Sequence, residues 1–267
     1  MTNWQTINRK RIRHIRSAQF ALVRMMNGLI IELSESLQGY ESVEALQNVA
    51  DNFRFDQQKF WDIWYKIYTE TGLDFAQFHF RQIKGKSNRI ETKDINDTIR
   101  RNIWTQKLLE YVDSECGDLI QNSIRTMYKG IQGNARKAIA MAAEEGWGAD
   151  RTAKEMIKIQ GQMNKAHAMR IARTEVVRAS NEGAFEGADA TGLDLKKVWI
   201  SASDARTRTL ADGDFDHDIM NGEKVDMNEP FNVNGDLLQY PGDPDGEPGN
   251  TINCRCTLGF EPKQSLL

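Results

Sequence analysis

The stretch of sequence that decides the fold is residues 199–256, which read WISASDARTRTLADGDFDHDIMNGEKVDMNEPFNVNGDLLQYPGDPDGEPGNTINCRC. All five prolines of the chain lie at or after Pro230, so the first 229 residues contain none. Proline breaks helices because it lacks a backbone N–H and clashes with the preceding turn. We therefore predict an α+β fold, in which a long helical N-terminal body is followed by a small, irregular antiparallel β module docked on helices.

Apolar residues before this stretch recur mostly every three or four positions, which is typical of helices. Helices are predicted over residues 3–39, from about 42, over 56–70, over 97–131 as one long or two abutting helices, between Gly133 and Gly146, over 150–161 and over 165–190. Residues 84–93 are expected to form a polar link. After Gly192 the period changes to two, which predicts short strands near 197–201, 224–225, 231–233, 237–240 and 254–258.

Composition limits the class of protein. No run of residues approaches the roughly 18 apolar positions that a membrane span needs, and the N-terminus has no apolar signal segment. We therefore expect a protein made and folded in a reducing cytoplasm, with no membrane partner. Three cysteines in 267 residues do not resemble a disulfide framework. The predicted division is a helical region over 1–130 and a second domain over 131–267.

The net charge of −3 hides opposite charges at the two ends. Residues 201–250 hold twelve acidic side chains and three basic ones, whereas residues 1–30 hold no acid and six basic residues: Arg9, Lys10, Arg11, Arg13, Arg16 and Arg24. Arg9, Arg13 and Arg16 are spaced by four and three, so they share one stripe of a helix. That stripe is either a solvated face or a contact for double-stranded DNA or an acidic partner, and both interpretations stay open.

Three interpretations compete for the chemistry of the tail. In the first, Cys254 and Cys256 point to one face of a strand and bind zinc together with His217 and a carboxylate. These are ligand types that zinc accepts. The spacing argues against a zinc site, because structural sites usually place two cysteines two to four residues apart around a turn.

In the second interpretation the tail binds calcium. Carboxylates stand at positions 1, 3, 5, 7 and 12 of a loop that resembles an EF-hand: Asp212, Asp214, Asp216, Asp218 and Glu223. Position 6 should be glycine to allow a sharp turn, but this chain has His217 there. Calcium is therefore less favoured than zinc.

In the third interpretation, which we favour, the polar residues are structural and no cofactor is expected. An irregular segment needs partners for its backbone groups, and arginine–carboxylate contacts supply them. The candidates are Arg173, Glu175, Asp204, Arg206 and Arg208. Specifically, we expect Arg173 on the helix over 165–190 to hold the turn at Asp204.

An ordered set of short motifs runs through residues 135–262, about half of the chain. The set comprises Ala172-Arg173-Thr174-Glu175, Trp199, Asp204-Ala205-Arg206-Thr207-Arg208, His217 with Asn221-Gly222-Glu223, Pro230-Phe231, Pro241-Gly242-Asp243-Pro244 and Asn253-Cys254-Arg255-Cys256-Thr257. In order and spacing it resembles the phage Mu protein F-like family, also called the phage head morphogenesis domain. The segment 209–216 departs from that pattern by being longer and more acidic.

The resemblance implies a minor head protein of a tailed phage or prophage, with residues 131–267 as its head morphogenesis domain. Such a protein would lie in the virion head, beside the portal or major capsid protein, and act in head assembly or DNA packaging. An enzyme is the alternative, since the family has been linked to ADP-ribosyltransferase-like folds. The sequence favours a non-enzyme, because no glycine-rich phosphate loop follows a strand.

Overall fold

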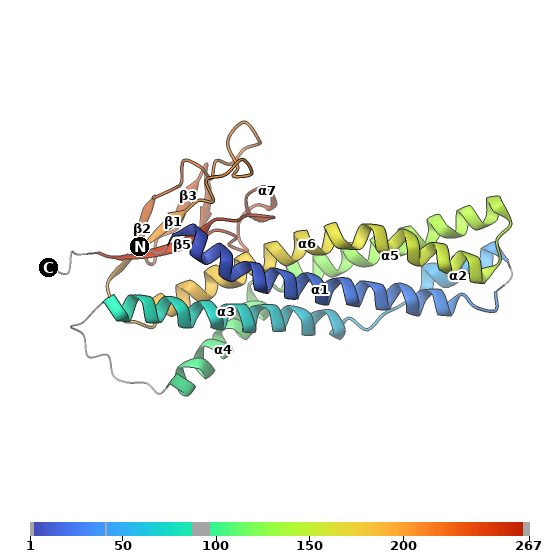
Figure 1. The fold of residues 1–267 in the computed structure, drawn as a ribbon, viewed down its shortest axis with the longest axis horizontal. Helices are drawn as coiled ribbons and strands as arrows, with labels where there is room; N and C mark the ends of the chain where they lie inside the picture. The colour runs from blue at the N-terminus through green and yellow to red at the C-terminus, as the bar shows by residue number, and fades with distance from the viewer. Residues whose placement is uncertain (1–2, 41, 87–96, 264–267) are drawn as a thin grey trace. The chain divides into compact units, whose positions relative to one another are not determined.

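The computed structural model describes residues 3–40, 42–86 and 97–263 of the chain. Long helices come first and short antiparallel strands follow, so the predicted α+β class is confirmed (Figure 1). In chain order the elements are α1 (Trp4–Ser36), α2 (Val43–Asn52), α3 (Gln58–Lys86), α4 (Asp97–Ser114), α5 (Gly117–Glu145), α6 (Ala149–Asp189), β1 (Leu195–Ile200), β2 (Lys224–Asp226), β3 (Phe231–Val233), β4 (Asp236–Leu238), α7 (Pro248–Thr251) and β5 (Thr257–Pro262).

The largest difference from the predicted elements is in α6. We expected one helix to end near Gly161 and a second to begin near Lys165, with Asn164 just before it as a possible cap, but a single helix continues through all three residues. The side chain of Asn164 is buried and donates to Asn27 Oδ1 over 2.6 Å. Because this amide is used in the interior, it does not act as a helix cap.

Other boundaries also moved. Helix α3 extends to Lys86, well past the predicted end near residue 70, and the predicted link over 84–93 lies outside the described residues from residue 87 onward. The segment over 97–131 is two helices, α4 and α5, separated at Cys116. Among the described residues, no helix is both long enough and apolar enough to cross a membrane.

The chain divides into two compact units that are discontinuous in sequence. Unit 1 comprises Met1–Arg16, Trp64–Gly117 and Ala172–Leu267, and unit 2 comprises Ser17–Ile63 and Asp118–Ile171. Helices α1, α3 and α6 contribute residues to both units. The boundary predicted between residues 130 and 131 falls inside α5.

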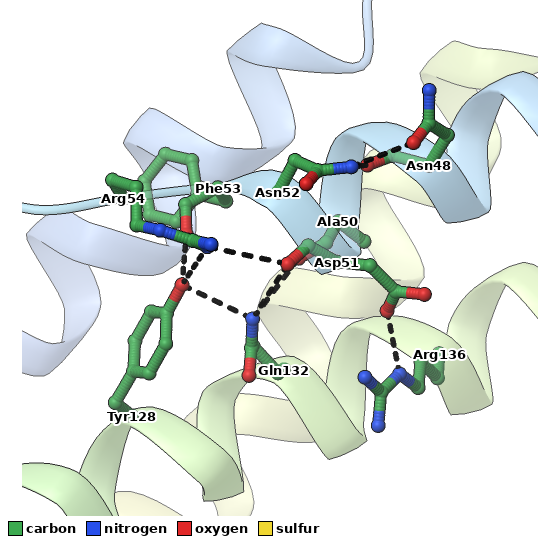
Figure 2. A network of polar contacts seen from close by, with 9 residues as sticks. All are labelled: Asn48, Ala50, Asp51, Asn52, Phe53, Arg54, Tyr128, Gln132 and Arg136. Carbon is green, nitrogen blue, oxygen red and sulfur yellow. Dashed lines mark hydrogen bonds and ion pairs between the residues drawn. The ribbon is translucent and has the colours of Figure 1, made fainter.

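Unit 2 is helical. Within it, side chains of α5 form hydrogen bonds and an ion pair with residues at the C-terminal end of α2 (Figure 2). The last carbonyls of a helix have no partner inside the helix and need one elsewhere. Tyr128 donates to the Phe53 carbonyl, and Gln132 Nε2 lies 3.3 Å from the Asp51 carbonyl. Arg136 Nε contacts the Asp51 carboxylate at 2.7 Å. These contacts define where α2 stops.

Unit 1 contains the tail module, which we define as residues 195–262. Strand β1 pairs antiparallel with β2 on one side and β5 on the other, and β3 pairs with β4 as a hairpin. Asn234 and Gly235 both have positive φ in the hairpin turn, a conformation that these two residue types tolerate best. Alternate residues of β1 are buried, and Trp199 on that face is fully enclosed.

Within unit 1, α3 and α6 approach unusually closely (Figure 1). A Cβ placed on Gly183 would lie 2.2 Å from the Gly72 carbonyl oxygen, and one on Gly187 would lie 2.2 Å from that of Ala76. Only glycine fits where two helix backbones touch in this way. This close contact fixes the position of the C-terminal part of α6, which carries site residues, relative to α3.

Candidate functional site

The C-terminal part of α6 holds the turn that precedes the two tail cysteines. Arg173 Nη1 donates to Asn253 Oδ1 at 2.5 Å, and Thr174 Oγ1 accepts from the Asn253 backbone N–H at 2.9 Å. Asn253 has a φ of 62°, in the left-handed region where asparagine is one of the few tolerated residues. Two successive helix residues therefore fix an otherwise unfavourable backbone conformation.

The predicted contact between Arg173 and Asp204 is wrong. Asp204 instead accepts both terminal nitrogens of Arg255, in the bidentate geometry that suits a guanidinium and a carboxylate. These hydrogen bonds from Arg255 hold the pKa of Asp204 well below its usual value. Arg206 adds a backbone N–H at 2.9 Å, and its exposed guanidinium reaches Asp204 only at 3.5 Å. Arg208 donates to a different acceptor, the backbone carbonyl of residue 252.

Glu175 belongs to the core of unit 1 and does not contact the Asp204 turn. It is 3% exposed, forms an ion pair with Arg178 at 3.0 Å and accepts from the Tyr68 hydroxyl at 2.6 Å. Arg178 Nε also donates to the Gly242 carbonyl at 2.9 Å. Arg173 and Glu175 therefore lie on different sides of α6 and contact different partners, as their spacing of two residues implies.

Arg11 on α1 is a residue whose role the sequence reasoning missed. It is 1% exposed and makes hydrogen bonds to α6 and to the start of β5; its acceptors are Ser180 Oγ, Asn181 Oδ1, Thr257 Oγ1 and the carbonyls of Arg255 and Cys256. Burial lowers the pKa of Arg11 to about 10, so it is still charged at neutral pH. Arg11 lies four residues after Ile7, so both side chains are on the same face of α1, and both are buried. This spacing from an apolar residue was the signal available in the sequence.

His217, Cys254 and Cys256 converge in the interior of the tail module. All three are 2% exposed, and His217 Nδ1 lies 3.6 Å from the sulfur of each cysteine. The other ring nitrogen, Nε2, lies 2.5 Å from Asn250 Oδ1. Trp199 packs edge-on against the imidazole, with ring centroids 5.4 Å apart. The structure thus brings His217 to two cysteines that follow it by 37 and 39 residues in the sequence.

The two cysteines of this cluster are free thiols, and the pKa of one is shifted down while that of the other is shifted up. A hydrogen bond from Cys256 lowers the pKa of Cys254 well below its usual value, and His217 acts in the same direction. The same contact with Cys254 raises the pKa of Cys256 well above its usual value. The contact between the two thiols therefore shifts their pKa values in opposite directions.

The acidic loop proposed for calcium uses carboxylates to cap its own backbone. Asp212 Oδ2 accepts from both the N–H and the hydroxyl of Thr209 at 3.0 Å, and Asp216 Oδ1 accepts from the N–H groups of Asp218 and Ile219. His217, at position 6 of the loop, turns inward to the cysteines. Among residues 3–40, 42–86 and 97–263, one group of three or more His, Cys or acidic residues lies close enough to share a metal ion. It consists of His217, Cys254 and Cys256.

The basic stripe predicted near the N-terminus lies on the first turns of α1. Arg9, Arg13 and Arg16 are exposed, whereas Arg11 between them is buried. Lys10 and His14 contact Asp74 of α3 at 2.5 and 2.9 Å. The three exposed arginines keep their side chains toward solvent, so the two interpretations of the stripe remain predictions.

Comparison with known proteins gives two matches. The family model for phage Mu protein F like protein matches residues 134–259. The NAD(+)--arginine ADP-ribosyltransferase EFV of Enterococcus faecalis (strain ATCC 700802 / V583) is 26% identical over 166 residues, which cover 61% of this chain and 29% of that protein. The chain thus spans less than a third of this relative. No solved structure matches this chain significantly.

The family match covers the residues that build the site. It begins within α5, includes all of α6 and ends inside β5, so Glu175, Asp204, His217 and both tail cysteines lie within it. The motifs that suggested the family from sequence alone are the same residues that the structure joins by contacts. Residues 134–259, just under half of the chain, therefore match the phage Mu protein F-like family, in agreement with the resemblance that the sequence motifs indicated.

Proposed function

We propose that the protein is a minor head protein of a tailed phage or prophage, assembled beside the portal or major capsid protein in the host cytoplasm and retained in the virion head. The family match over residues 134–259 carries this proposal. The use of polar groups in unit 1 supports it. Glu175, Asp204 and Arg255 are joined to other parts of the chain, as expected of a rigid assembly component.

Association with heads is the direct test of this function. When the chain is co-expressed with the major capsid and portal proteins of its own phage, we expect it to sediment with assembled particles in a density gradient. Omitting the portal protein distinguishes the two partners, because a portal-bound protein would then leave the particle fraction. A chain that stays at the top of the gradient in every combination would contradict the proposal.

For the exposed stripe of Arg9, Arg13 and Arg16, we propose contact with packaged double-stranded DNA. Changing all three to glutamate should weaken the dependence of DNA affinity on salt. In a plot of the logarithm of the binding constant against the logarithm of the salt concentration, the slope should become less steep by about 0.9 for each lost phosphate contact. The measurement is DNA binding across a salt series. The matched control changes Arg125, Lys129 and Lys137, which are exposed on α5, to glutamate. Equal effects in both variants would indicate general charge and would remove the stripe as a specific contact.

An NAD-dependent transferase is the second candidate function, favoured by the name of the Enterococcus faecalis relative, whose match covers 61% of this chain. The segment Arg173-Thr174-Glu175 does not suit an NAD site, because Glu175 is buried against Tyr68 and Arg178. We expect purified protein to release no nicotinamide from NAD above the rate in buffer. Chromatography of the reaction products measures this. Nicotinamide release that follows the protein through purification would establish the enzyme instead.

A further inference from the structure

The distances within the cysteine–histidine cluster match those around a tetrahedral zinc ion. Zinc holds thiolate sulfur at about 2.3 Å and imidazole nitrogen at about 2.0–2.1 Å. With tetrahedral angles, these bond lengths separate each sulfur from the nitrogen by about 3.6 Å. His217 Nδ1 lies 3.6 Å from Cys254 Sγ and 3.6 Å from Cys256 Sγ. Both sulfur–nitrogen distances are therefore those that one shared zinc ion would set, and all three ligand atoms lie within 4.8 Å of one another.

The hydrogen bonds around His217 leave the correct nitrogen available as a ligand. Asn250 Nδ2 donates to Asp236 Oδ2 at 2.7 Å, which assigns Asn250 Oδ1 as the atom that faces the imidazole. Since this oxygen can only accept, the proton of the neutral imidazole lies on Nε2. Nδ1 then presents a lone pair to the two sulfurs. Histidines that bind zinc are typically oriented in this way by an oxygen on the other ring nitrogen.

A cluster held only by hydrogen bonds explains the geometry less well. The single lone pair on His217 Nδ1 can accept one S–H, yet both sulfurs lie at the same distance from it. The segment that carries the two sulfurs is also held in place. Arg11, which is 1% exposed, donates to the backbone carbonyls of Arg255 and Cys256.

We propose that His217, Cys254 and Cys256 bind one zinc ion, with the fourth position filled by water or a small ligand. The ion would join the acidic loop to the segment that leads into β5, which are 37 residues apart at their closest ligands. A crosslink of this kind stabilises a small, irregular module with few apolar residues of its own. This inference does not depend on the role of the protein in phage heads.

Metal content and a matched set of variants test the site. The untagged protein is purified without chelator and dialysed against buffer that contains trace zinc. Inductively coupled plasma mass spectrometry should then find one zinc ion per chain. C254S, C256S and H217Q should each reduce the content at least tenfold. C116S is the control, because Cys116 is equally buried in unit 1 but lies outside the cluster. It should retain the full zinc content.

A second measurement separates loss of zinc from loss of the fold. Cobalt added to the wild-type protein after zinc removal should produce the intense charge-transfer absorption of thiolate–cobalt bonds, and zinc should displace it. C116S should give the same spectrum, while C254S should lose most of it with helical circular dichroism unchanged. The proposal fails if wild-type protein takes up neither metal at a one-to-one ratio, or if mass spectrometry finds a disulfide between Cys254 and Cys256 in protein prepared under reducing conditions.

Discussion

Replacing Arg11 with methionine should lower the free energy of unfolding by about 3 kcal/mol, which corresponds to about 6–12 °C in melting temperature for a chain of this size. Methionine keeps the apolar stem but removes the guanidinium. The acceptors on Ser180, Asn181 and Thr257 then remain buried without that donor. Each buried polar group left unpaired costs about 1–3 kcal/mol, and relief from burying the charge offsets part of this cost.

The control for this prediction lies two residues further along the same helix. Arg13 is exposed, so Arg13→Met should change stability by no more than about 0.5 kcal/mol. Urea unfolding followed by circular dichroism gives both values. If the two variants unfold at the same urea concentration, Arg11 does not hold the tail module to α1. An additional Asn181→Ala change should add less in the Arg11→Met background than in the wild type, because the two residues share a contact.

The features that follow from local sequence were predictable. The absence of proline before Pro230 indicated a helical body, and the two-residue period near 197–201 indicated a strand, which the structure contains as β1. Ser42 was expected near a helix start, and its side chain accepts from the Ala45 backbone N–H as an N-cap. Each of these depends on residues within one or two turns of one another. Such information is present in the sequence without a fold.

The contacts between distant residues were not predictable in the same way. Arg173 and Arg255 are both suitable partners for Asp204, and only the path of the chain decides that Arg255 reaches it. The burial of Arg11 depends on which side of α1 the tail module covers. His217 and Cys254 were singled out as candidate ligands by residue type, but their spacing of 37 residues contains no information about a distance of 3.6 Å.

Glu182 should make the stability of the protein fall as pH rises through the neutral range. It lies on α6 in unit 1 and is 8% exposed. Burial, with the nearby negative charges of Glu186, Glu115 and Asp243, raises the pKa of Glu182 to about 8, although a hydrogen bond with Tyr240 opposes the shift. The folded protein therefore keeps a proton on this carboxyl group at pH values where the unfolded chain, with a pKa of 4.5, has lost it.

The sign of the effect follows from this difference in bound protons. Between about pH 4.5 and 8 the folded state binds one more proton than the unfolded state, so the contribution is complete below pH 4.5 and is lost as pH rises through 8. At about 1.4 kcal/mol per pH unit, the full change is on the order of 5 kcal/mol. Glu182→Gln cannot ionise, so its stability relative to the wild type should rise by up to this amount across the range.

Urea unfolding at a series of pH values between 4.5 and 8.5 measures that relative stability. Glu144→Gln is the control, because Glu144 is exposed on α5 and its replacement should leave a constant difference from the wild type. A constant difference for Glu182→Gln as well would mean that Glu182 is ionised in the folded protein. The charge would then need a counterion, but Lys107, whose charge interacts with that of Glu182, already pairs with Glu186 at 2.6 Å. A second buried carboxylate beside that pair would be poorly compensated, which is why we expect Glu182 to be protonated.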